Sequence, residues 1–155
     1  MFDLLILDID GVMTSGDKYY DDNADVIMKK FNDRDFTAIK RFKMAGVKVC
    51  FLSGDARVNK SMAKDRGVDF YLSKTWVEGS NKASFIPEFV KTYDVCASRM
   101  AYVGDDFYDV GVMSEVGHAY CPSNSPRYVK NVATSLAVKA GDGVVASLYD
   151  LVFDD

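Results

Sequence analysis

An apolar run near the amino terminus, ending in two aspartates, constrains the fold of this chain more than any other stretch. From Leu4 to Thr14 the sequence reads LLILDIDGVMT, so a run of strand length leads directly into Asp8 and Asp10. Side chains at i and i+2 of a strand point to the same side, and both carboxylates can converge on one ligand. Two carboxylates this close repel unless a cation or a shared proton relieves them. The pattern favours a Mg²⁺ site over the alternative, an ordinary Asp-Gly turn.

Composition places the chain among folded proteins. Its 155 residues, 48% of them hydrophobic, predict one domain over residues 1–155 and exclude disorder. No apolar stretch approaches the roughly 20 residues of a membrane span, and the first strand begins too early to leave room for a signal peptide. The net charge of −4 argues against a nucleic-acid-binding surface. We therefore expect neither a membrane nor a nucleic acid as a partner.

The cysteines indicate a reducing compartment. Cys50, Cys96 and Cys121 are odd in number and follow no metal-ligand spacing. Cys50 falls in an apolar run and is expected to be buried in a strand. The set predicts reduced thiols in a cytoplasmic protein.

Apolar runs of strand length alternate with helical patterns along the chain. Strands are expected at residues 4–9, 47–52, 70–72, 100–103 and 118–121, and helices at 34–45, 57–66, around 85–93, 108–116 and 144–153. This alternation predicts an α/β fold with a doubly wound parallel sheet. A hairpin is expected around Asp21-Asp22-Asn23, between residues 18–20 and 26–31. Pro87 falls within a helical pattern, so that helix either starts late or is kinked there.

Further polar residues follow the ends of the expected strands, where ligands bind in doubly wound sheets. Ser53-Gly54 follows the second run, and Gly104-Asp105-Asp106 follows residues 100–103, with Asp109 one helical step on. Lys82 stands near a helix start, preceded by Gly79-Ser80-Asn81. A hydroxyl, a backbone N–H and a lysine can bind phosphoryl oxygens, and the diacid can complete a Mg²⁺ site. Taken singly, Ser-Gly is a turn and Lys82 a surface lysine; their order along the chain favours a common site.

In that order, the aspartate pair, hydroxyl, lysine and diacid resemble the haloacid dehalogenase-like phosphohydrolases over nearly the whole chain. The resemblance implies that Asp8 is the nucleophile, forming an aspartyl-phosphate. Asp10 would protonate the leaving alcohol, activate the hydrolytic water and give its backbone carbonyl to Mg²⁺. Ser53 and Lys82 would hold the phosphoryl group. The metal would bind Asp8, Asp10 and Asp105, with Asp106 and Asp109 as supporting acids.

The spacing leaves room only for a hairpin flap and not for a cap domain, which resembles one branch of that family. The segments that carry this likeness are Asp8–Gly16, Phe31-Asn32-Asp33-Arg34-Asp35, Gly79-Ser80-Asn81-Lys82 and Tyr102-Val103-Gly104-Asp105-Asp106. The branch comprises phosphatases of eight- and nine-carbon 2-keto-3-deoxy sugar acid phosphates, which are tetramers closed by their neighbours' hairpins. The resemblance implies a homotetramer and a small phosphorylated sugar acid as substrate, bound by Ser53, Gly54, Lys82, Arg34 and Arg57. Solvated hairpin charges are the alternative reading of Arg34 and of Lys30.

Two features depart from that branch. Asp55 stands where the octulosonate enzymes carry an arginine after the Ser/Thr-Gly pair, which looks more like the nine-carbon phosphatases, and Arg57 is a partial substitute. The glycine-rich tail is here Gly141-Asp142-Gly143-Val144, with no arginine after it. Both departures concern substrate choice and closure of the site.

Three other functions fit parts of the pattern. A phosphorylation-dependent receiver domain has a similar order of acids, hydroxyl and lysine, but its phosphoacceptor should end the third strand, where this chain has Ser53. A catalytically silent scaffold would not need Asp8 and Asp10. A related phosphatase acting on another phosphosugar or on a phosphoprotein keeps the chemistry and changes only the substrate.

Overall fold

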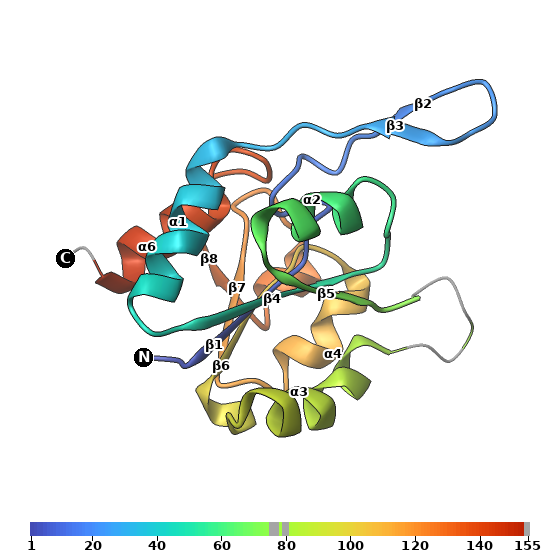
Figure 1. The fold of residues 1–155 in the computed structure, drawn as a ribbon. Coiled ribbons are helices and arrows are strands. Elements are labelled where there is room, and N and C mark those ends of the chain that lie inside the picture. Colours follow the sequence, from blue (N-terminus) through green and yellow to red (C-terminus); the bar gives the residue numbers. More distant parts are fainter. Residues whose placement is uncertain (75–77, 79–80, 154–155) are drawn as a thin grey trace.

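A six-stranded parallel sheet forms the centre of the molecule (Figure 1). A computed structural model describes residues 1–74, 78 and 81–153. The strands lie in the order β5-β4-β1-β6-β7-β8, and every neighbouring pair is parallel. Their bounds are β1 Leu4–Leu7, β4 Lys48–Ser53, β5 Asp69–Leu72, β6 Met100–Val103, β7 His118–Cys121 and β8 Thr134–Ser135.

Helices cover both faces of this sheet, as the doubly wound arrangement requires. One face packs against α1, α2 and α6 through Phe42, Ala63 and Leu148, and the other against α3, α4 and α5. The helices are α1 Asp33–Met44, α2 Asn59–Arg66, α3 Ile86–Tyr93, α4 Val110–Met113, α5 Arg127–Lys130 and α6 Val144–Phe153, with 3-10 turns η1 Lys82–Phe85, η2 Ala97–Arg99 and η3 Phe107–Asp109. No helix in the described ranges is both long and apolar enough to cross a membrane.

Strand β1 is fully buried and divides the core into two layers. Leu5 and Leu7 belong to the cluster under α1 and α6, whereas Leu4 and Ile6 belong to the cluster under α3 and α4. A continuous apolar run is what a strand covered on both faces requires. The chain crosses from β1 to β4 on one side and reaches β6 on the other, so the strand order reverses at β1. Ligands bind at such a reversal, beyond the carboxyl ends of the strands.

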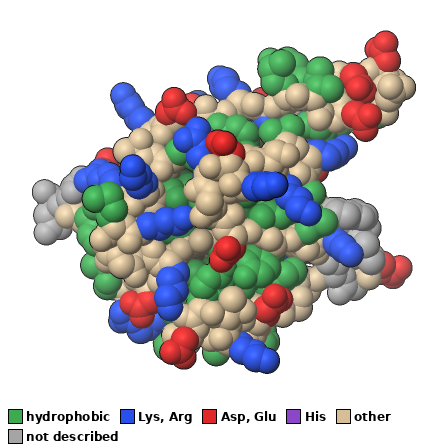
Figure 2. Space-filling model, in the orientation of Figure 1, with side chains coloured by type: hydrophobic (Ala, Val, Ile, Leu, Met, Phe, Trp, Pro, Cys, Tyr) green, Lys and Arg blue, Asp and Glu red, His purple; other side chains and the backbone are tan. Residues whose placement is uncertain are grey.

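A two-stranded antiparallel hairpin, β2 (Tyr19–Tyr20) with β3 (Val26–Met28), projects from the body of the protein (Figure 1). Four of its apolar side chains, Tyr19, Tyr20, Ile27 and Met28, are more than half exposed. Figure 2 shows hydrophobic side chains on the hairpin and acidic ones at its tip. An apolar surface on a projecting element is typical of a contact with another molecule.

The structure confirms the predicted fold class, and several boundaries differ from expectation. The first strand ends at Leu7 and not at residue 9, because the chain turns there toward the site. The helix expected at 108–116 is shorter, divided between η3 and α4, and ends at Met113. β8 was not predicted, since two exposed polar residues carry no strand pattern. Pro87 lies in the first turn of α3, so that helix starts late and is not kinked. The expected loop residues Gly79 and Ser80 lie outside the described residues.

Asp35 joins the start of α1 to the start of α6, and its loss is expected to destabilise the fold. The carboxylate is fully buried, and its Oδ1 accepts the backbone N–H groups of Val145 at 2.9 Å and Ala146 at 3.1 Å. Asp35→Ala leaves both donors unpaired, so the free energy of unfolding should fall by about 1–2 kcal/mol in urea denaturation. Asp35→Asn keeps an acceptor oxygen and should lose less; equal losses would contradict the capping role.

Candidate active site

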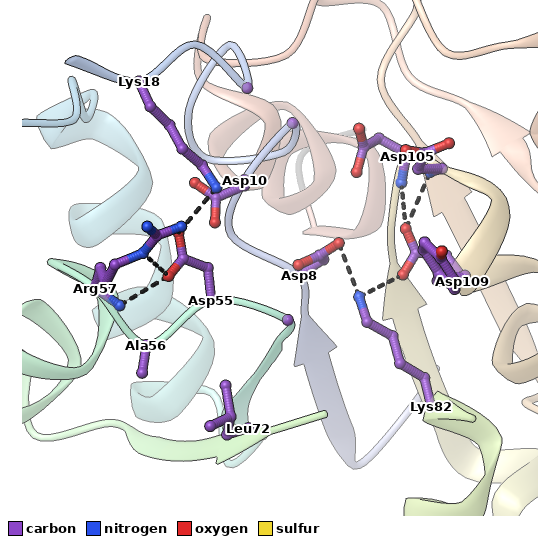
Figure 3. A pocket seen from close by; sticks show the side chains of 15 residues that line it. Asp8, Asp10, Lys18, Asp55, Ala56, Arg57, Leu72, Lys82, Asp105 and Asp109 are labelled. Carbon is purple, nitrogen blue, oxygen red and sulfur yellow. Dashed lines mark hydrogen bonds and ion pairs between the residues drawn. The ribbon is translucent and has the colours of Figure 1, made fainter. Parts of the chain in front are cut away.

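A cavity of about 740 Å³ opens at the carboxyl ends of β1, β4 and β6 (Figure 3). This is the edge of the sheet where the strand order reverses. Fifteen residues line the cavity: Asp8, Asp10, Gly11, Gly16, Lys18, Gly54, Asp55, Ala56, Arg57, Leu72, Lys82, Asp105, Asp106, Tyr108 and Asp109. Polar groups from segments far apart in the sequence therefore meet at one place, the arrangement typical of a ligand site.

The innermost group contains three carboxylates and one lysine. Carboxylate oxygens of Asp8, Asp105 and Asp109 lie within 4.8 Å of one another. Lys82 points between them (Figure 3) and donates to Asp8 Oδ2 at 2.9 Å and to Asp109 Oδ1 at 2.7 Å. When all four are ionised, three negative charges face one positive charge, which leaves two negative charges in a largely buried place. Such an excess requires a cation or bound protons.

Asp109 supports the site by fixing its neighbours. Its Oδ1 accepts hydrogen bonds from Lys82 and from the hydroxyl of Tyr102. Its Oδ2 accepts the backbone N–H groups of Asp105 at 2.9 Å and Asp106 at 3.0 Å. Both oxygens are thus occupied, so Asp109 is placed to position Lys82 and the loop that carries Asp105.

The charge imbalance shifts the pKa values of the buried groups. Burial raises the pKa of Asp8 to about 7, although Lys82 opposes the shift. Burial, with the negative charges of Asp8 and Asp109, raises the pKa of Asp105 to about 8. Burial alone would lower the pKa of Lys82, but the negative charges of Asp8 and Asp109 have the larger effect and raise it. Lys82 therefore stays charged and, despite burial, holds the pKa of Asp109 below its usual value, whereas Asp8 and Asp105 without a second cation tend to hold protons.

The residues present fit a hard divalent cation. Asp8 and Asp105 offer carboxylate oxygens, and no described residue hydrogen-bonds the Asp105 carboxylate. Gly11 has φ +80°, and a Cβ there would lie 1.9 Å from Asp105 Oδ2, so only glycine lets that carboxylate approach the loop after β1. Oxygen ligands with two excess negative charges are the set that Mg²⁺ prefers.

Divalent cations are expected to raise the melting temperature, more at about pH 8 than at about pH 5.5. The raised pKa values of Asp8 and Asp105 mean that their ionised forms are disfavoured in the folded, cation-free protein. The protonated carboxyl groups stabilise the folded protein fully below 3.8, the pKa in the unfolded chain. This stabilisation is lost as the pH rises toward the folded-state pKa values of about 7 and about 8. Thermal unfolding with and without Mg²⁺ measures the effect. Asp105→Asn should remove most of the shift; an unchanged shift would place the cation elsewhere.

A second group of charges lies beside the first and joins the hairpin to the site. Asp55 Oδ2 accepts hydrogen bonds from Lys18 at 2.8 Å and Lys29 at 3.2 Å, and Arg57 Nε donates to Asp55 Oδ1 at 2.9 Å. Lys29 also contacts Asp10. Burial alone would raise the pKa of Asp55, but Arg57, Lys18 and Lys29 hold it well below its usual range. Asp55 is therefore a permanent anion that fixes three cations.

Most of the residues predicted from the sequence lie at the cavity, and two do not. Ser53 is fully buried and absent from the cavity lining; its hydroxyl donates to the backbone oxygen of Asp55. Arg34 is exposed and lies outside the lining set. Asp106 lines the cavity but is exposed, caps η3 and accepts the Tyr128 hydroxyl.

Sequence reasoning missed four residues that contact this site: Lys18, Lys29, Asn59 and Tyr102. Tyr102 lies within an apolar strand, and Lys18 and Lys29 have the pattern of ordinary charged residues in a hairpin, so neither pattern indicates a site. Asn59 stands in a helical segment with no catalytic pattern around it. The one available signal was the position of Tyr102 near a strand end, two residues before Gly104.

Comparison with known proteins identifies the family. The model for haloacid dehalogenase-like hydrolases matches residues 68–148. The 3-deoxy-D-manno-octulosonate 8-phosphate phosphatase of Haemophilus influenzae is 32% identical over 151 residues, which cover 96% of this chain and 81% of that protein. The chain belongs to the haloacid dehalogenase-like hydrolases.

Other relatives of this haloacid dehalogenase-like hydrolase carry the same activity in their names. The octulosonate 8-phosphate phosphatase of Escherichia coli is 27% identical over 96% of this chain and 78% of its own length. The cobalt-bound structure of the Haemophilus influenzae phosphatase has a TM-score of 0.89 and 30% identity, covering 99% of this chain and 94% of that one. The structure of the Yersinia pestis phosphatase has a TM-score of 0.87 and 28% identity, covering 97% of this chain and 80% of that one. The protein is thus a phosphatase of this family, similar to the octulosonate 8-phosphate phosphatases.

Proposed function

We propose that the protein is a Mg²⁺-dependent phosphomonoesterase whose nucleophile is Asp8. The observation that carries the proposal is the meeting of Asp8, Lys82, Asp105 and Asp109 at the floor of the cavity. Asp8 lies at the end of the central strand, with its Oδ1 accepting the Ile9 N–H at 2.8 Å and its Oδ2 held by Lys82. The carboxylate is thereby fixed in one orientation, which a nucleophile requires.

The residues divide the reaction into two steps. In the first, a carboxylate oxygen of Asp8 forms a bond to phosphorus, the bond from phosphorus to the ester oxygen breaks, and Asp10 gives its proton to the departing alcohol. In the second, Asp10 removes a proton from water, the water oxygen bonds to phosphorus, and the bond to Asp8 breaks. Lys82 and the Gly54 backbone bind the phosphoryl oxygens. Mg²⁺, held by Asp8, Asp10 and Asp105, would screen the repulsion between nucleophile and phosphate.

We further propose that the substrate is a phosphorylated 2-keto-3-deoxy sugar acid, with the eight-carbon octulosonate 8-phosphate as the first candidate. The names of the relatives support this class. The charges beside the cavity support it too, because Lys18, Arg57 and the buried Lys29 carry three positive charges against the two negative charges of Asp10 and Asp55. One positive charge is left over, which suits a substrate carboxylate.

Nine-carbon sugar acid 9-phosphates are a second candidate class, favoured by Asp55. Its carboxylate lines the cavity and is held by Lys18, Lys29 and Arg57, so an anion occupies the position where the octulosonate enzymes carry an arginine. A carboxylate accepts hydrogen bonds from sugar hydroxyls. Asp55 therefore favours a substrate that presents a hydroxyl to this side of the cavity.

We also propose a homotetramer in the cytoplasm. The exposed apolar side chains of the hairpin and the absence of a cap over the described cavity support closure by neighbouring copies. The thiols of Cys50, Cys96 and Cys121 are free, which supports a reducing compartment. Light scattering at micromolar concentration tests the assembly, and a monomer would contradict it.

Phosphate release from a panel of esters, with and without Mg²⁺, tests the proposed function. The panel contains eight- and nine-carbon keto sugar acid phosphates, hexose phosphates and a phosphopeptide. We expect Mg²⁺-dependent turnover with a preference for one keto sugar acid phosphate. Equal turnover of hexose phosphates would contradict the proposed substrate class. Phosphate release at the same rate without Mg²⁺ would contradict the proposed metal dependence.

A further inference from the structure

The carboxylate of Asp10 is held by two side chains for which the reaction scheme above gives no role. Asn59 Nδ2 donates to Asp10 Oδ2 at 2.9 Å, and Lys29 Nζ donates to the same oxygen at 3.1 Å. Lys29 Nζ also lies 3.0 Å from Oδ1 as an ion-pair contact, and neither its side chain nor Asn59 is exposed to solvent. Lys29 thus lies against both oxygens, Oδ1 is buried, and the Asp10 carboxylate is fixed where it lines the cavity.

The orientation of the Asn59 amide follows from its neighbours. Besides Asp10 Oδ2, the group lies 3.2 Å from Ser53 Oγ and 3.0 Å from the backbone oxygen of Asp55. The Ser53 hydroxyl donates its hydrogen to that same backbone oxygen, so toward Asn59 it is an acceptor. Three acceptors surround one amide position, which requires the NH₂ group there. Asn59 thus connects the segments that follow β1 and β4.

The backbone before Asn59 is strained. Val58 has φ +64° and ψ −46°, a region that β-branched residues rarely adopt, and the Asn59 N–H donates to the Arg57 oxygen at 2.7 Å. This is the geometry of a classic γ-turn, the strained form of that turn.

Stability alone does not account for this arrangement. Asn59 is fully buried, yet its Oδ1 has no hydrogen-bond partner among the described residues. A buried unpaired amide oxygen and a strained turn are both unfavourable, and such features persist where the surrounding structure or the chemistry requires them. What the arrangement achieves is a fixed position for the Asp10 carboxylate.

We propose that Asn59 is a positioning residue for proton transfer: with Lys29, it fixes the orientation in which the Asp10 carboxylate meets the leaving group and then water. The inference rests on the proposed function, in which Asp10 is the acid and base. Lys29 directly follows β3 and also contacts Asp55, so the hairpin base and α2 together hold Asp10. Loss of Asn59 should therefore impair the proton transfers and spare the attack by Asp8.

Two phosphate esters with different leaving groups separate these steps. An alkyl phosphate needs a proton on its departing oxygen, whereas p-nitrophenyl phosphate releases a weakly basic phenolate and does not. In Asn59→Leu, turnover of the alkyl ester should fall at least about tenfold. The first turnover with p-nitrophenyl phosphate should stay near the wild-type rate. Breakdown of phosphorylated Asp8 still needs Asp10, so nitrophenolate should appear as a burst approaching one equivalent per active site, followed by slow release.

Controls separate positioning from folding and from the proposed function. Asn131→Leu makes the same substitution at an exposed asparagine outside the cavity lining and should behave as wild type. Asn59→Asp has nearly the same shape, removes the NH₂ donor and should show the same burst if Asn59→Leu does not fold. Equal losses on both esters without a burst, wild-type rates on both, or failure of both variants to fold would overturn the proposal. Failure of the proposed function would appear separately, as a wild-type enzyme that hydrolyses neither ester.

Discussion

Asp8→Asn is expected to lower kcat by at least about a thousandfold while leaving the fold intact. An amide does not attack phosphorus, so the covalent step is lost. Asparagine has nearly the same shape, and its oxygen can still accept the Lys82 or Ile9 donor that now holds Asp8. The substitution therefore removes the proposed nucleophile and little else.

Stability distinguishes this result from simple unfolding. Because Asp8, Asp105 and Asp109 share one small volume, removing one carboxylate relieves repulsion, and the melting temperature without metal should stay the same or rise. Asp65→Asn is the matched control, since its side chain is 78% exposed and forms a surface ion pair with Arg66. Retained turnover in Asp8→Asn would show that Asp8 is not the nucleophile. Lost turnover with a lower melting temperature would indicate damage to the fold.

The sequence predicted the sheet and the meeting of the acids with Lys82, because both depend on local patterns. Each long apolar run became a buried strand, and the acids and Lys82 that follow those runs meet at the cavity. In a parallel sheet the carboxyl ends of neighbouring strands share one edge, so residues at strand ends converge without any knowledge of tertiary contacts. β8 was missed because its two residues pair with β7 through the backbone alone.

The second group of contacts could not be predicted because it joins residues far apart in the chain. Asn59 and Asp10 are separated by 49 positions, and Lys29 and Asp55 by 26. Neither Asn59 nor Lys29 directly follows a strand of the parallel sheet. Asn59 reaches Asp10 through the unusual backbone of Val58. A single sequence carries no signal for such a turn. The same limit applies to Ser53, which stands at the end of β4 but whose hydroxyl turns toward Asp55 and Asn59 and away from the cavity lining.

Lys82→Met is expected to lower the free energy of unfolding by about 3–5 kcal/mol at neutral pH and to abolish turnover. The lysine side chain is 4% exposed and pairs with Asp8 and Asp109, whose side chains are 10% and 1% exposed. Methionine fills a similar volume but leaves two buried carboxylates without their cation. Turnover is lost as well, because no charge remains to hold Asp8 and the phosphoryl group.

The loss of stability in Lys82→Met should shrink as pH falls. With the lysine gone, burial acts on Asp8 without its main opposing cation, so the pKa of Asp8 rises further above the unfolded value of 3.8 and its ionised form destabilises the folded state. Asp109, which is also buried, loses the cation that chiefly holds its pKa below the usual value. For a raised carboxyl pKa, stability is retained at low pH and lost as pH rises through the folded-state value. Urea unfolding at about pH 5 and about pH 8 should therefore show the larger deficit at the higher pH.

A double variant tests whether uncompensated charge is the cause. Lys82→Met with Asp109→Asn removes one buried anion together with its cation, so it should be more stable than Lys82→Met alone even though it carries one more substitution. The amide oxygen introduced by the second substitution could still accept the backbone N–H groups of Asp105 and Asp106, which now bind Asp109 Oδ2. If the double variant is less stable than the single one, packing of the lysine stem and not its charge stabilises this site. A deficit that does not change with pH would point the same way, since packing does not titrate.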